Sequence, residues 1–162
     1  MSEDRLSLGL IQDQSIEDNP VLPVLPRISQ ANGLISRRKK AALALHWIKE
    51  LAVKIGHQSD PISTLSDGNQ QRIVLAKWLA TEPTVLILDS PTVGVDVGAR
   101  AGIFQILRKL AEQGFAILMI SDEVPEAYFN ADRVLHMAGV KIVGEYDPRK
   151  INLKELEEAV YG

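Results

Sequence analysis

The sequence predicts an α/β fold in which a largely helical first half is attached to a sheet of buried strands. Two short segments, Val85 to Leu88 and Ala116 to Ile120, consist of apolar residues alone. Runs of this kind are typical of strands that are covered on both faces of a parallel sheet. Because predicted helices follow both runs, we expect strands and helices to alternate with right-handed crossovers.

The first half contains two predicted helices. One extends from Arg37 to Ile55, with Ser36 as its N-cap and Gly56 as its stop. The other extends from about Asp67 to Thr81, with Ser66 as its N-cap. Both have apolar residues at helical spacing, so each is expected to bury one face.

The segment from Asn19 to Arg27 contains prolines at positions 20, 23 and 26. Proline lacks an amide hydrogen, and within a helix its ring clashes with the preceding turn. We therefore expect an extended connection here and no helix.

The remaining elements are predicted from their start and stop signals. They are a helix capped by Asp96 that reaches about Gln113 and ends at Gly114, and a short helix from Glu123 to Phe129. A hairpin of Arg133 to Met137 and Lys141 to Tyr146 follows, and the capping box of Asn152 and Glu155 opens the last helix.

Composition limits the possible functions. The chain has 162 residues, 46% of them hydrophobic and 24% charged, which is typical of a globular domain. Its net charge of -3 gives no electrostatic reason to expect nucleic acid as a partner. The absence of cysteine excludes disulfides, thiolate catalysis and cysteine-ligated metals. No run approaches the roughly 18 apolar residues of a membrane span, so we expect at most peripheral membrane contact.

A first candidate site is Ser66-Asp67-Gly68 at the start of a predicted helix. A helix start presents N–H groups and the positive end of the helix dipole, which together favour a phosphate. Ser66 either caps the helix or donates its hydroxyl to a ligand, and Gly68 allows a ligand to approach the backbone. Alone, this pattern is more often a plain cap.

A second candidate is Asp89, at the end of the first predicted strand. A carboxylate at this point faces the crevice where α/β proteins bind ligands, and in phosphate-handling sites it holds Mg²⁺ through water. In isolation, a solvated aspartate is the simpler interpretation. Ser90-Pro91-Thr92-Val93-Gly94-Val95-Asp96 comes next, and Ser121-Asp122-Glu123 follows the second strand.

Together these segments resemble the ATP-binding cassettes of bacterial ABC-type sugar importers. Leu65 to Gln71 is similar to the signature Leu-Ser-Gly-Gly-Asn-Gln-Gln, and Leu86 to Ala99 to Leu-Ile-Leu-Asp-Glu-Pro-Thr-x-Gly-Val-Asp-Val-Gly-Ala. The Asn-Gln-Gln ending resembles the ribose/galactose/arabinose type, in which one polypeptide carries two cassettes. Glu3-Asp4-Arg5 and Leu8-Gly9-Leu10 resemble the stretch that follows the core sheet of the second cassette.

The resemblance implies a partial P-loop NTPase sheet with an attached helical subdomain. Residues 1–82 would form that subdomain, including the signature helix, and residues 83–162 the C-terminal portion of the ATPase core. It also implies an energising subunit that couples binding and hydrolysis of ATP, with Mg²⁺, to sugar uptake. Its partners would be another cassette, a membrane permease docked on the helical subdomain and, indirectly, a periplasmic sugar-binding protein. This would place the chain in the cytoplasm, at the inner face of the cell membrane.

The resemblance also implies roles for individual residues. In that family the signature of one cassette meets the ATP held by the opposite cassette. Ser66, Gly68 and Gln70 would thus face a partner's γ-phosphate. Asp89 would hold Mg²⁺ in the chain's own site, and Asp96 would belong to the loop that touches the partner.

Departures from the family pattern all concern the chemistry. The sequence contains no Gly-x-x-x-x-Gly-Lys-Ser/Thr, the Walker A phosphate-binding loop, so we expect no ATP binding in the chain's own site. Ser90 stands where the family has the glutamate that polarises the attacking water, and losing a general base costs roughly 10²–10⁴-fold in rate. Asp67 replaces the first signature glycine, and Asp122 stands at the switch position, where most cassettes have histidine. We therefore expect no intact catalytic residue.

Three hypotheses follow from these observations. The leading one is a partial second cassette of a sugar-import ATPase that does not turn over ATP alone. The second is a non-catalytic module that docks on a permease or an intact cassette. The third is the tail lobe of a chromosome-associated ABC ATPase, which the lack of a sustained heptad repeat disfavours.

Overall fold

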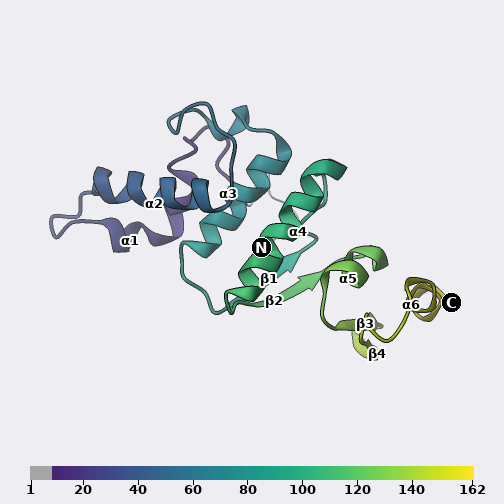
Figure 1. Cartoon of the computed structure of the whole chain (residues 1–162). Helices are drawn as coiled ribbons and strands as arrows, with labels where there is room; N and C mark the ends of the chain where they lie inside the picture. The colour runs from purple at the N-terminus through teal and green to yellow at the C-terminus, as the bar shows by residue number, and fades with distance from the viewer. Residues whose placement is uncertain (1–8) are drawn as a thin grey trace. The chain divides into compact units, whose positions relative to one another are not determined.

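The structure, a computed structural model, describes residues 9–162, so the resemblances noted at Glu3 to Leu8 lie outside it. The chain divides into two units, residues 1–118 and 119–162. The first contains η2 (Asn19–Val24), α1 (Leu25–Ile28), α2 (Arg37–Glu50), η3 (Ile62–Thr64), α3 (Asp67–Leu79), β1 (Val85–Asp89) and α4 (Val97–Glu112) (Figure 1). β2 (Ala116–Ile120) pairs with β1 and crosses the border between the units. The predicted helical subdomain, residues 1–82, thus lies within the same unit as β1 and α4, and its boundary at 82 remains a prediction.

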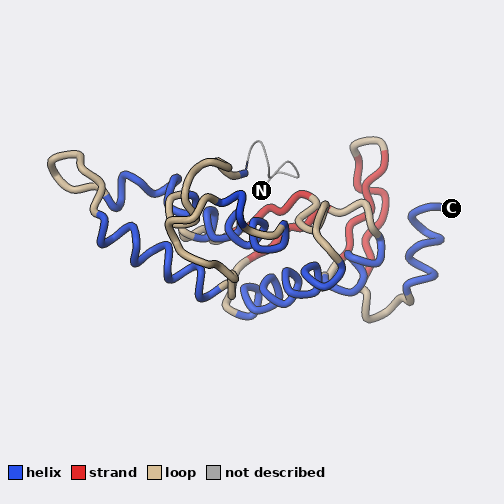
Figure 2. The backbone as a smooth tube through the Cα atoms, turned by 90° about the horizontal axis from the view of Figure 1, so that it is seen from above, coloured by secondary structure: helices blue, strands red, loops and turns tan. Residues whose placement is uncertain are grey.

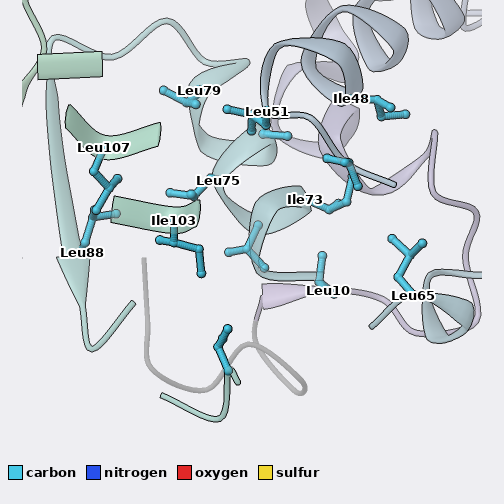
Figure 3. Close-up of a cluster of buried hydrophobic side chains, with 14 of the residues drawn as sticks. Leu10, Ile48, Leu51, Leu65, Ile73, Leu75, Leu79, Leu88, Ile103 and Leu107 are labelled. Carbon is cyan, nitrogen blue, oxygen red and sulfur yellow. The ribbon is translucent and has the colours of Figure 1, made fainter. Parts of the chain in front are cut away.

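α3 is the central element of the first unit. Most of its side chains are buried, because η2, α2 and α4 all pack against it. Leu75 of α3, Ile103 of α4 and Leu88 of β1 belong to one apolar cluster (Figure 3). Burying a side chain of this size contributes about 1.5–3 kcal/mol, so this cluster stabilises the unit.

α2 ends earlier than the sequence predicts. Ser36 caps it as expected, but the helix stops at Glu50 and not at Ile55. Ala52 takes a left-handed backbone conformation (φ 50°), and the Val53 amide donates to the Ile48 carbonyl at 2.9 Å. This is a Schellman-type ending. This ending directs Val53 into the core. The burial of Val53 therefore ends the helix several residues before Gly56.

The expectation of an extended segment at 19–27 is wrong. Residues 19–24 form the 3₁₀-helix η2 and residues 25–28 the short helix α1, which run beside α2 in both views (Figures 1 and 2). Two of the prolines stand in the first turn of these elements, where no intrahelical amide bond is lost. Val21, Val24 and Ile28 are buried against α2 and α3, and this burial outweighs the local preference.

The expectation that both strands are buried on two faces is also wrong. In β1, Leu86 and Leu88 are buried, whereas Val85 and Ile87 are 54% and 53% exposed. In β2, Leu118 is exposed as well. Within residues 9–162 this sheet has two strands, β1 and β2, and its second face is exposed. We call Val85, Ile87 and Leu118 the open sheet face.

The second unit agrees with its prediction. It contains α5 (Val124–Asn130), the antiparallel hairpin of β3 (Val134–Ala138) and β4 (Lys141–Tyr146), and α6 (Leu153–Tyr161). Asn152 and Glu155 form the expected capping box, and α6 buries Leu156. Within residues 9–162, no helix combines the length and apolar character needed to cross a membrane.

Candidate functional site

Ser66 lies exposed at the start of α3. Its backbone carbonyl accepts hydrogen bonds from the amides of Asn69 and Gln70, both at 2.9 Å. Its side chain does not cap the helix but accepts a bond from Asn69 Nδ2 at 2.9 Å. The hydroxyl proton of Ser66 is therefore available to an acceptor at the protein surface.

Asn69, the first residue of the Asn-Gln-Gln ending, has a structural role that the sequence did not predict. Besides its bond to Ser66, its Oδ1 accepts from the amide of Lys54 at 2.9 Å. Asn69 thus ties the signature segment to the chain that follows α2. Asparagine frequently makes such bonds to nearby backbone, but a partner fifteen positions away cannot be found by local pattern.

Gly68 lies in the first turn of α3 and is buried where α3 contacts α4. A Cβ atom placed on it would lie 2.6 Å from Ala99 Cβ, closer than real side chains come. The close approach of the two helices therefore requires glycine here, whether or not a ligand binds. A role of Gly68 toward a partner's nucleotide remains a prediction.

Gln70 does not accompany Ser66 at the surface. Gln70 is only 6% exposed, and its Nε2 donates a hydrogen bond to the Leu65 carbonyl at 2.9 Å. Its Oε1 accepts from Gln12 Nε2 at 3.4 Å. In this structure Gln70 holds the backbone before Ser66, and it does not present its amide outward.

Asp96 caps α4, as the sequence predicts, with Oδ1 accepting from the Ala99 amide at 3.0 Å. It is exposed, as is Ser66. Because Gly68 of α3 packs on Ala99 of α4, the N-termini that carry Ser66 and Asp96 are held together by a buried contact. The structure thus brings two of the predicted partner-facing residues onto adjoining elements.

Asp89 and Ser90 are half-buried where β1 ends. Ser90 has φ 45°, a left-handed conformation that costs a non-glycine residue about 1–3 kcal/mol. Within residues 9–162 no cluster of three or more metal-ligating side chains exists, and a role of Asp89 toward Mg²⁺ remains a prediction. The sequence contains no phosphate-binding loop to accompany these residues.

Asp122 belongs to the second unit. Its carbonyl accepts from the Tyr161 hydroxyl at 3.3 Å, and Ser121 beside it donates to Glu126 Oε2 at 2.8 Å. These contacts hold the segment after β2 against α5 and α6. They are structural, and a switch role for Asp122 remains a prediction.

Several known proteins are similar to this chain. Residues 4–93 match the family model described as ABC transporter. The chain is 42% identical to the ribose import ATP-binding protein RbsA of Rhodococcus jostii over 99% of its own length and 32% of that protein's. It is 40% identical to the xylose import ATP-binding protein XylG of Thermoanaerobacter pseudethanolicus, over 90% and 29% of the two lengths. The chain thus spans about a third of the relatives it matches.

Solved structures agree with these matches. A dimeric bacterial ABC transporter cassette superposes with a TM-score of 0.72 at 26% identity, covering 89% of this chain and 61% of that one. Three observations agree. The fold alternates strands and helices, a signature segment stands at a helix start, and the family model matches more than half of the sequence. The chain belongs to the ABC transporter family and is a partial ATP-binding cassette.

Proposed function

We propose that this chain contributes the signature half of a composite ATP site to a sugar importer. The observation that carries the proposal is the junction of α3 and α4, which presents Ser66 and Asp96 on adjoining helix starts. The relatives named for ribose and xylose import support a carbohydrate as the transported substrate. The nucleotide would be held by an intact cassette, and the Ser66 hydroxyl would donate to its γ-phosphate.

The remaining parts of the proposal follow from the family. ATP and Mg²⁺ would belong to the partner cassette, since this chain lacks a phosphate-binding loop. The predicted helical subdomain, residues 1–82, would dock on a membrane permease, which works with a periplasmic sugar-binding protein. The chain would therefore act in the cytoplasm, at the inner face of the cell membrane.

The composite site can be tested by nucleotide-dependent association. A suitable probe is the RbsA protein of Rhodococcus jostii loaded with Mg²⁺ and the slowly hydrolysed analogue ATPγS. We expect association that requires nucleotide and weakens about 10- to 100-fold in Ser66→Ala, the range for a lost hydrogen bond to a charged group. Ser63→Ala, an exposed serine outside the signature, is the matched control. Association that does not depend on nucleotide would contradict the proposal. So would an equal loss of affinity in Ser66→Ala and Ser63→Ala.

The incompleteness of the chain's own site has a separate test. Isothermal titration of the isolated chain with MgATP should show no tight binding. Tight binding that disappears in Asp89→Asn would show that β1 carries a working site and would overturn this part of the proposal.

A second candidate function is a non-catalytic docking module, favoured by Ser90 at the position of the water-polarising glutamate. Such a module would bind a permease or an intact cassette without depending on nucleotide. Co-purification with an intact cassette that needs no nucleotide and persists in Ser66→Ala supports this candidate. Loss of the complex in that variant supports the composite site.

A further inference from the structure

Gln71 is a buried amide whose presence apolar packing does not explain. It lies in α3 as the last residue of the signature segment Leu65 to Gln71, and it is 3% exposed. Its Nε2 donates to the carbonyl of Pro91, while its Oε1 is buried with no hydrogen-bond partner in the described part of the chain. A buried acceptor without a partner costs free energy, and a methionine would fill similar volume without that cost. What the amide provides is the bond to Pro91.

Pro91 is the second residue of the loop between β1 and α4, residues 90–96. Proline has no amide hydrogen, so its carbonyl is its one main-chain group for hydrogen bonding. The loop then makes two turns, with Val93 N donating to Ser90 O at 3.2 Å and Val95 N to Thr92 O at 3.1 Å. It ends at Asp96, the exposed cap of α4. Gln71 therefore holds the loop at its first turn.

A second contact joins the same two elements near the other end of the loop. Gly68 packs on Ala99, and a Cβ at Gly68 would lie 3.7 Å from Val95 Cγ1. The loop is thus attached to α3 at Pro91 through Gln71 and at Val95 through Gly68. With both contacts in place, the signature segment and Asp96 keep a constant spacing.

We propose that Gln71 is a positioning residue that fixes loop 90–96 to the signature helix, so that Ser66 and Asp96 reach a partner cassette in one geometry. This inference rests on the proposed function, because it concerns the surface that meets the partner's nucleotide. Gln71 itself touches neither partner nor nucleotide. It acts through the Pro91 carbonyl.

The test compares two chemically equal substitutions. Gln71→Met removes the bond to Pro91 together with the unpartnered oxygen. Gln58→Met is the matched control, because Gln58 also buries an unpartnered Oε1 but lies in the loop before η3. Both variants should fold: each removes an unsatisfied buried acceptor, and in Gln71→Met this offsets the loss of the donor to the Pro91 carbonyl.

The direct measurement is the distance between α3 and the loop. The chain has no cysteine, so spin labels can be attached at Trp78→Cys in α3 and Val93→Cys in the loop, both exposed positions. Double electron–electron resonance should give one narrow distance distribution in the labelled parent and in Gln58→Met. Gln71→Met should broaden it. An unchanged distribution in Gln71→Met overturns the positioning role, whatever the association data show.

The second measurement is association with ATPγS-loaded RbsA, as above, using the unlabelled variants. We expect Gln71→Met to weaken the association about tenfold, which corresponds to the net free energy of one hydrogen bond. Gln58→Met should leave the affinity unchanged. Equal affinities in Gln71→Met and wild type overturn the inference while leaving the proposed function intact. A wild-type chain that does not associate overturns the proposed function, and the partner-facing role of Gln71 with it.

Discussion

Asn19, Gln70 and Gln71 are amide side chains that the first unit buries, and each donates to a main-chain carbonyl. Asn19 is the most deeply buried of them. Its Oδ1 accepts from the Ile11 amide at 2.8 Å, and its Nδ2 donates to Ile11 O at 3.2 Å and Ser15 O at 3.1 Å. Asn19 therefore organises the loop that precedes η2, and no apolar residue can replace these bonds.

Asn19→Leu should lower the free energy of unfolding by roughly 3 kcal/mol, because main-chain groups of Ile11 and Ser15 lose their buried partner. Urea unfolding followed by circular dichroism measures this. Asn32→Leu is the control: Asn32 is exposed and accepts one bond, from the Leu34 amide, so its loss should cost no more than about 1 kcal/mol. Equal losses in the two variants would contradict the role assigned to Asn19.

Asp18 gives the first unit a pH-dependent contribution. Burial disfavours its charged form, but hydrogen bonds from Lys40 and Ser15 and the charge of Lys40 outweigh burial, so the pKa of Asp18 is lowered. Lys40 Nζ lies 2.7 Å from Asp18 Oδ1 and 2.8 Å from Glu17 Oε1. Because the folded state favours the carboxylate, its stabilisation is present above the unfolded pKa and disappears as pH falls through the folded one.

The expected outcome is a stability difference between wild type and Asp18→Asn that is largest near pH 7 and narrows below about pH 4. Denaturant titrations at several pH values measure it. In a Lys40→Met background the same substitution should lose most of its effect at pH 7. If the stability difference between wild type and Asp18→Asn grew as pH falls, the lowered pKa assigned to Asp18 would be contradicted.

At the scale of elements, helix ends are decided by the backbone that the core selects. Ala52 occupies the left-handed position at the end of α2, where glycine is preferred, and Gly56 lies too late to be used. Arg72 Nη1 of α3 donates to the carbonyls of Leu51 and Ala52 at 3.0 and 2.7 Å. This long-range contact holds a turn that the local sequence does not favour.

Ala52→Gly should therefore stabilise the chain by about 1 kcal/mol, because glycine adopts φ near 50° without the steric cost of Cβ. Ala52→Val should destabilise it, since a β-branched side chain fits this conformation worst. Thermal and urea unfolding measure both. A loss of stability in Ala52→Gly would mean that flexibility of the unfolded chain outweighs the relief of strain.

At the scale of the whole molecule, the chain is part of a larger fold. It covers 61% of a solved cassette that it resembles, and the open sheet face of Val85, Ile87 and Leu118 is apolar. In monomeric proteins, extended apolar patches are uncommon unless something binds to them. The chain by itself therefore exposes surface that a complete domain would bury.

This surface predicts a different outcome for two adjacent residues of β1. Ile87→Thr should reduce the binding of the dye ANS to the isolated chain and change its stability by less than about 0.5 kcal/mol. Leu86→Thr, on the buried face, should cost about 3 kcal/mol. Dye fluorescence and urea unfolding measure the pair. Equal stability losses would show that both faces of β1 are covered.

Local signals predicted much of this fold. The caps at Ser36 and Asp96, the capping box of Asn152 with Glu155, the strand positions and the hairpin are confirmed. Each depends on residues a few positions apart, which a pattern along the chain contains. The motifs from Leu65 to Gln71 and Leu86 to Ala99 indicated the family for the same reason.

Tertiary structure decided the rest of the site. Contacts between α3 and distant parts of the chain decide how the site residues lie. Ser66 is exposed and Gln70 points inward. Gly68 packs on Ala99, and Gln71 donates a hydrogen bond to Pro91. The sequence by itself determined the family and most of the elements, though not η2, α1 or the end of α2, because caps and apolar periodicity are local. Which side chains face a partner was decided only when the elements packed, because burial depends on neighbours that are remote in sequence.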